Sequence, residues 1–176
     1  MIEFYKYTDR ELQELIDSMV IIIDTREKNN NHLLKMFDKM GIKYVTRALK
    51  YGDYSFYIPE NDKLGINKPL FFDKQIIVER KGSLEEISGN LTEHRDRFEK
   101  ELALAPSEKV IIIESCNYAD IINGNYRTKY NQKSFWASYH SFWHKYNCPI
   151  VFMPDKYMSA YFIRGYFVYY LKNKLR

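Results

Sequence analysis

Four short apolar runs, rich in β-branched residues, most constrain how this chain can fold. They lie at residues 20–23, 75–80, 109–114 and 150–153, and the first and third read VIII and KVIIIE. Continuous runs of this length fit strands that are buried on both faces of a sheet. Segments with apolar residues at helical spacing separate them. We therefore predict an α/β domain with a mixed central β-sheet flanked by helices.

Capping and turn signals predict the remaining elements. Thr8 and Ser83 each precede a glutamate by three residues, the capping-box spacing, so we predict helices from residue 8 and from residue 83 to about 104. Further helices are predicted over about 30–40, 118–122, 134–145 and 155–172, the last capped by Asp155. Strands at 43–49 and 54–58, with a turn at 51–53, lie too close together for a parallel crossover, which predicts a mixed sheet. The polar segment 59–69 is predicted to be a surface loop.

Length and composition predict one soluble domain. The chain has 176 residues, 45% of them hydrophobic, which suffices for one core but not for two ordinary domains. We expect a single domain over 1–176, with its motif-bearing core at about 20–153. No apolar run approaches the roughly 20 residues of a membrane helix, and the N-terminus lacks the apolar stretch of a signal peptide. We expect an intracellular protein without a membrane partner, in the cytoplasm of a bacterial host if a phage encodes it or in the nucleus if a eukaryote does.

Charge and cysteine content bear on which partners and metal sites are possible. A net charge of +4 permits a polyanionic partner without requiring one. Cys116 and Cys148 form no CxxC pair, so neither a disulfide framework nor a zinc cluster is predicted.

Acidic residues recur where the predicted strands end or turn. Asp24 follows the first apolar run, Asp53 lies in the turn at 51–53, and Glu79 comes directly after the apolar residues 76–78 of the second run. Alternate side chains of a strand share a face, so Glu79 and Lys81 should point one way and Arg80 the other. If the strands at 54–58 and 75–80 are neighbours, Asp53 can meet Glu79. This pair of carboxylates, with an ammonium beside it, predicts a site for a hard divalent cation.

Mg²⁺ fits these ligands best. It binds a few carboxylates together with waters and phosphate oxygens, and the sequence offers no competing His/Cys ligand set. Such a metal neutralises phosphate charge, lowers the pKa of a bound water and stabilises the departing oxygen. Lys81 could then orient or activate the attacking water, or stabilise charge at phosphorus.

Three motifs, D-T-R-E at 24–27, G-D at 52–53 and E-R-K at 79–81, resemble the signature of XPF-type nucleases. The similarity covers about residues 20–153 and implies the restriction-endonuclease-like PD-(D/E)xK fold. It implies cleavage of branched, flap or fork DNA with Mg²⁺ or Mn²⁺, in repair or recombination. The family's catalytic positions fall here on Asp24, Glu27, Asp53, Glu79 and Lys81, and Asp24, Asp53 and Glu79 would hold the metal. Glu85 stands where the family pattern has an aspartate, which makes it a supporting candidate.

Several basic and aromatic residues are candidates for DNA contact. The resemblance places Arg26 and Arg80 near the active site, and Arg97 with its neighbours looks like the family's basic–aromatic step in the next helix. Aromatic rings between basic residues can stack on bases, which makes 126–130 the preferred exposed candidate, whereas most other aromatic residues should pack in the core. We expect no helix-hairpin-helix domain of the kind found in larger family members, and an accessory DNA-binding subunit is a candidate partner. The final predicted helix is apolar on more than one face, which together with the resemblance predicts a homodimer. The DNA-binding candidates are Arg26, Arg80, Arg95, Arg97, Lys100, Tyr126, Arg127, Lys129 and Tyr130.

Simpler interpretations compete with each motif taken singly. Asp24 could cap a helix, Asp53 could occupy an ordinary turn, and Glu79 with Lys81 could form a surface ion pair. As an ordered set behind apolar strands they favour a nuclease site. The alternative function is a non-catalytic DNA-binding scaffold, against which the intact acids argue. No glycine-rich phosphate loop is present, so nucleotide hydrolysis is disfavoured.

Overall fold

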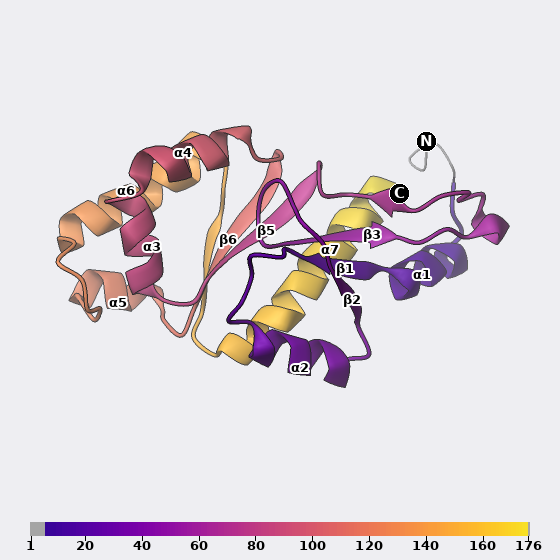
Figure 1. The fold of residues 1–176 in the computed structure, drawn as a ribbon, viewed down its shortest axis with the longest axis horizontal. Helices are drawn as coiled ribbons and strands as arrows, with labels where there is room; N and C mark the ends of the chain where they lie inside the picture. Colours follow the sequence, from indigo (N-terminus) through magenta and orange to yellow (C-terminus); the bar gives the residue numbers. More distant parts are fainter. Residues whose placement is uncertain (1–5, 176) are drawn as a thin grey trace.

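The computed structural model describes residues 6–175 and shows a mixed β-sheet between two groups of helices (Figure 1). The strand order is β2-β1-β3-β5-β6-β7, and β4 pairs with β3. The pairs β1–β2, β5–β6 and β6–β7 are parallel, whereas β3 is antiparallel to β1 and to β5. The predicted fold class is confirmed. The strands are β1 (Val20–Ile23), β2 (Lys43–Thr46), β3 (Tyr54–Ile58), β4 (Leu70–Phe71), β5 (Ile76–Lys81), β6 (Glu108–Glu114) and β7 (Ile150–Met153).

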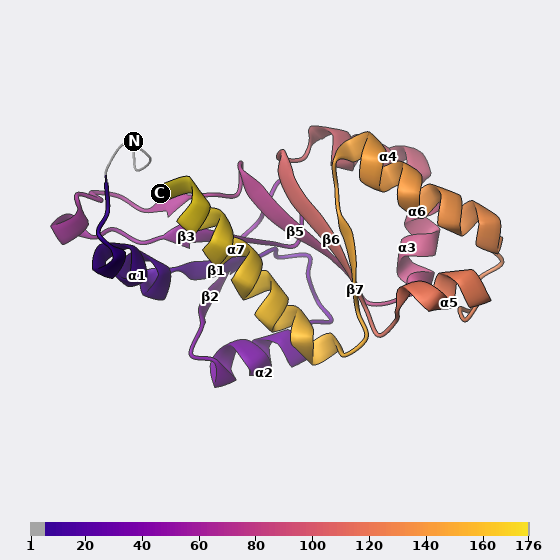
Figure 2. The ribbon, with the colours of Figure 1, turned by 180° about the vertical axis from the view of Figure 1, so that it is seen from behind.

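The helices form two groups that cover different parts of the sheet. Figures 1 and 2 show α1, α2 and α7 around β1 to β3, and α3 to α6 gathered at the other end of the molecule. The helices are α1 (Asp9–Ser18), α2 (Asn31–Lys39), α3 (Leu84–Leu91), α4 (Arg95–Leu104), α5 (Tyr118–Asn123), α6 (Gln132–Tyr146) and α7 (Ser159–Leu175), with the 3-10 helices η2 (Asp62–Leu64) and η3 (Lys156–Met158).

Alternation along β6 divides the interior into two apolar cores. Val110 and Ile112 pack into the core under α1, α2 and α7, whereas Ile111 and Ile113 pack into the core under α3 to α6. This follows from the period of two in a strand, since successive side chains point to opposite faces. The same alternation in β5 assigns its polar residues to opposite faces of the sheet.

β2 and β3 follow each other along the chain but are not neighbours in the sheet. The two strands do not pair, because β1 lies between them and is joined to β2 through the parallel crossover of α2. The strand predicted at 43–49 also ends early, at Thr46. Its continuation leaves the sheet because the Leu49 N–H donates to the buried carboxylate of Asp24, at 2.6 Å.

Two predicted helices differ from the structure. The helix expected from 83 to 104 is divided into α3 and α4, where the N–H groups of Thr92 and His94 both donate to the Gly89 carbonyl. This turn lets both helices bury apolar residues in the same core. Asp155 caps η3 rather than α7, its carboxylate accepting from the Tyr157 N–H at 2.9 Å, and α7 extends to Leu175.

The segment predicted as a surface loop at 59–69 contains η2 and buries Leu64 and Ile66. Among the helices of residues 6–175, none is long and apolar enough to cross a membrane.

Candidate active site

Gly52 brings the start of β3 close to β5. Its φ is +70°, a region that glycine adopts without strain, and a Cβ at this position would lie 2.8 Å from the Ile77 Cβ. The next residue, Asp53, donates its N–H to the Val78 carbonyl at 2.9 Å, and its Oδ2 accepts from the Arg80 N–H at 2.8 Å. Since Tyr54 pairs with Val78 in antiparallel register, Asp53 comes opposite Glu79. The expected meeting of these two acids is therefore observed.

Glu79 and Lys81 lie on one face of β5, as the alternation predicts. The Lys81 ammonium donates to Glu79 Oε1 at 2.8 Å and lies 3.8 Å from a carboxylate oxygen of Glu86 on α3. It also lies 5.4 Å from the centre of the Phe98 ring on α4. The Lys81 side chain is 9% exposed, so its charge acts in a largely dry environment.

The charges of Asp53 and Lys81 respond to each other and to burial. Burial, with the negative charge of Glu79, raises the pKa of Asp53 well above the ordinary carboxyl value. Burial by itself would lower the pKa of Lys81, but the carboxylate of Glu79 outweighs it, and the pKa is raised. Lys81 is therefore an ammonium at neutral pH.

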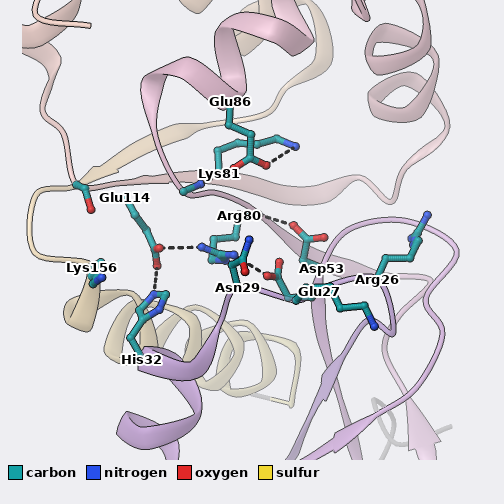
Figure 3. A pocket seen from close by; sticks show the side chains of 13 residues that line it. Arg26, Glu27, Asn29, His32, Asp53, Arg80, Lys81, Glu86, Glu114 and Lys156 are labelled. Atoms are coloured by element: carbon teal, nitrogen blue, oxygen red, sulfur yellow. Dashed lines mark hydrogen bonds and ion pairs between the residues drawn. The ribbon is translucent and has the colours of Figure 1, made fainter. Parts of the chain in front are cut away.

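Arg80 points to the opposite face, where a chain of buried charges holds it (Figure 3). Its Nη2 donates to Glu27 Oε1 at 2.5 Å and its Nη1 to Glu114 Oε2 at 2.8 Å, and Glu114 in turn contacts His32 Nε2 at 2.9 Å. The side chains of Glu27, Glu114 and Arg80 are each at most 7% exposed. The Arg80 guanidinium thus holds Glu27 beside the site, and although Arg80 lines the larger hollow, only 7% of its side chain is exposed.

Asp24 has a different environment from Asp53. Its Oδ1 accepts from the Arg26 N–H and Nε–H, at 2.9 and 2.6 Å, and its Oδ2 accepts from the Leu49 N–H. Burial opposes ionisation of Asp24, but these hydrogen bonds outweigh it and lower its pKa. Asp24 therefore ties together the two loops that flank the site, with two donors on Oδ1 and one on Oδ2.

The acids that could hold a divalent cation are Asp53 and Glu79. Within residues 6–175, no group of three or more His, Cys, Asp or Glu side chains is already arranged to hold a metal ion, and the metal role predicted for Asp24 stays a prediction. A pair of carboxylates still fits Mg²⁺, which takes its remaining ligands from waters and phosphate oxygens. A cation would also relieve the repulsion that raises the Asp53 pKa.

Two hollows in the surface meet at this site. The larger, of about 570 Å³, lies on the Arg80 side, and the smaller, of about 190 Å³, lies beside Glu79. Arg26, Asp53 and Lys81 line both hollows, and Arg97 lines the smaller one.

The other DNA-contact candidates lie in varied surroundings. Arg97 is 78% exposed and pairs with Glu101 at 2.9 Å, whereas Arg95 pairs with Glu99 at 2.9 Å and Lys100 is exposed.

The exposure predicted for the segment at 126–130 is wrong for its two rings. Tyr126 and Tyr130 are partly buried, and both pack against Phe135, with ring centres 5.2 and 5.3 Å apart. Arg127 and Lys129 are exposed.

Three polar residues near the site were not predicted. Glu86 faces Lys81, whereas the candidate Glu85 accepts the Arg127 N–H at 2.8 Å and so holds the 126–130 segment against α3. Glu114 follows the third apolar run as Asp24 follows the first, so the same pattern could have identified it. His32 carries no local signal, since its contact with Glu114 joins residues far apart in the chain.

Comparisons with known proteins identify the fold and the family. The model of the ERCC4 domain family matches residues 23–166. Among solved structures, XPF from Aeropyrum pernix superposes with a TM-score of 0.62 at 20% identity, covering 89% of this chain and 62% of that one. The same protein described as a complex with DNA gives a TM-score of 0.63 at 20% identity, covering 88% and 66%. This chain thus spans under two thirds of the first relative's length. The comparison with curated proteins gives no match. Because the family model covers most of the chain, including all three acidic motifs, the chain belongs to the ERCC4 domain family of XPF-type nucleases.

Proposed function

We propose that this protein is a divalent-metal-dependent endonuclease that hydrolyses DNA backbone phosphodiester bonds at branched, flap or fork structures. The observation that carries the proposal is the convergence of Asp53, Glu79 and Lys81 at the junction of two hollows. Two acids with a buried ammonium beside them match what backbone hydrolysis needs, which is a metal site next to a fixed positive charge.

Each of the three residues has a distinct role in this proposal. Asp53 and Glu79 would hold Mg²⁺, or Mn²⁺ in its place. The bound metal would neutralise phosphate charge and make a coordinated water more acidic. Lys81, which stays protonated beside Glu79, would stabilise the negative charge that grows on the phosphate oxygens as water attacks.

Glu27 and Arg80 support this arrangement from the other face of β5. Arg80 bonds Asp53 through its backbone N–H and Glu27 through its guanidinium. Glu27 therefore contributes a fixed negative charge near Asp53, and we assign it a positioning role.

DNA is the proposed substrate because of family membership and because the similar A. pernix XPF is described in complex with DNA. The preference for branched DNA follows from the family, and so do roles in repair or recombination. A second subunit, identical or accessory, would supply grip on the duplex arms.

The test is cleavage of end-labelled duplex, single-stranded, flap, fork and four-way-junction DNA, with Mg²⁺, with Mn²⁺ and with chelator. We expect cuts in branched substrates that require the metal and disappear in Asp53→Asn. Tight, branch-selective binding without any cut in either metal would instead favour the non-catalytic scaffold.

A further inference from the structure

The larger hollow extends the site beyond the residues that the motifs identify. Figure 3 shows Lys156 and His32 at one end of it and Arg26 at the other, with Asp53 and Lys81 between. Lys28 also lines this hollow. Lys28 comes from the loop between β1 and α2, and Lys156 from η3, so two segments far apart in sequence converge here.

The charges inside this hollow divide into a paired set and an unpaired set. Glu27 and Glu114 are both bound by Arg80, and Glu114 is also bound by His32, so these acids are largely compensated. Lys28 and Lys156 are exposed, and in residues 6–175 neither lies within ion-pair distance of an acid. The Lys156 ammonium lies 5.8 Å from the centre of the Tyr157 ring, which leaves its charge uncompensated. Among the described residues, the rim of the hollow therefore presents positive charge that no acid neutralises.

The smaller hollow carries cations on the opposite side of the site. Lys50 lines it together with Arg97, and the Lys50 ammonium lies 5.2 Å from the centre of the Tyr51 ring. Cations thus lie on both sides of Asp53 and Lys81. A phosphodiester that is being cut has a nucleotide on each side, and a groove with cations along it is the arrangement that follows a single nucleic-acid strand.

We propose that the larger hollow is a strand-binding subsite, in which Lys28 and Lys156 bind a backbone phosphate next to the one that is cut. The subsite rests on the proposed nuclease function and names where the substrate continues past the reacting phosphate. The ligand of the subsite is one DNA strand. The part of the same strand on the other side of the cut binds in the smaller hollow.

The test compares the double variant Lys28→Gln/Lys156→Gln with a matched control, Lys63→Gln/Lys74→Gln. Lys74 precedes β5, at the end of the strand remote from Lys81, and Lys63 lies in η2; both control lysines are exposed. For each protein, cleavage of a labelled flap and equilibrium binding in Ca²⁺ by fluorescence anisotropy are measured from about 50 to 200 mM salt.

For Lys28→Gln/Lys156→Gln we expect KM to rise about tenfold with kcat within about twofold. The slope of log affinity against log salt should decrease by about 0.7 for each phosphate that the variant no longer neutralises. The control should match the wild type. A neutral methylphosphonate at each phosphate flanking the cut locates the subsite. On one side of the cut, the methylphosphonate should weaken DNA binding by the wild type and leave binding by the double variant unaffected. On the other side of the cut, it should weaken DNA binding by both proteins.

The outcomes separate this proposal from the proposed function. Equal affinity and salt slope in the double variant and the control would overturn the subsite while cleavage stands. Binding that is weakened in the double variant, in a protein that cuts no DNA, would support the subsite and overturn the nuclease. A wild type that binds no DNA would overturn both.

Discussion

Asp24 and Asp53 make an instructive comparison, because each belongs to an acidic motif and their backbones are joined by a hydrogen bond of 2.8 Å. Asp24 has both oxygens bound by loop donors and a lowered pKa. Asp53 has one oxygen bound by a backbone N–H, faces Glu79 and has a raised pKa. Asp24 is thus fixed by donors from two loops, whereas Asp53 is buried next to another acid and gains from a cation. We therefore assign a scaffold role to Asp24 and a chemical role to Asp53.

The largest expected effect is the loss of DNA cleavage when Asp53 or Glu79 is replaced. Asp53→Asn and Glu79→Gln should each reduce kcat by about 10³-fold, since each removes a metal-binding charge at nearly constant volume. Single-turnover cleavage of a labelled flap measures this. Retention of more than about a tenth of the activity in Mg²⁺ would remove that acid from the metal site.

Lys81→Met should have the next largest effect. It preserves the apolar stem and removes the charge, so kcat should decrease by about 10²-fold while DNA affinity changes by less than about threefold. A decrease in DNA binding alone would show that Lys81 grips the substrate and does not stabilise the reacting phosphate. Lys39→Met, which changes an exposed lysine at the end of α2, is the control.

Asp24→Asn tests the scaffold side of the comparison. The amide nitrogen cannot accept hydrogen bonds, so one of the loop segments loses its acceptor, and the free energy of unfolding should decrease by about 1–3 kcal/mol. Cleavage per folded molecule should remain within about tenfold of the wild type. Urea denaturation and single-turnover cleavage together decide this, and a decrease in cleavage equal to that of Asp53→Asn with unchanged stability would make Asp24 a metal ligand.

The smallest effect is on the stability of the metal-free protein. A raised folded-state pKa means that the native state holds the Asp53 proton more tightly than the unfolded state does. Stability is therefore lost as the pH rises above the unfolded value, about 4 for an aspartate. Asp53→Asn removes this penalty and keeps an acceptor for the Arg80 N–H, so in chelator at pH 7 its Tm should exceed the wild-type Tm by a few degrees. The difference in Tm should vanish near pH 4. If the variant were less stable than the wild type at pH 7, ionised Asp53 beside Glu79 would not be destabilising, contrary to this account.

Sequence reasoning reached the Asp53–Glu79–Lys81 group because it depends on local rules. The period of two fixes which residues of β5 share a face, and Gly52 marks the turn that brings Asp53 to it. The strands and most helices follow from similarly local patterns.

The remaining features depend on interactions between distant residues. The loop contact of Asp24 depends on a hydrogen bond to Leu49, 25 residues away, which no local pattern predicts. Arg80 and its partner Glu114 are 34 residues apart, and Glu114 and its partner His32 are 82 residues apart. No rule based on local spacing predicts such pairs. The placement of β1 between β2 and β3 was missed for the same reason, since a turn signal does not state which strand is the neighbour.

The most direct test of the central claim is Mn²⁺ binding to the wild type, Asp53→Asn and Asp24→Asn, measured by electron paramagnetic resonance without DNA. We predict that Asp53→Asn loses the bound Mn²⁺ of the wild type, and that Asp24→Asn keeps it with an affinity within about threefold. Loss of Mn²⁺ in Asp24→Asn, with full binding retained in Asp53→Asn, would reverse the assignment of the two acids and contradict the claim.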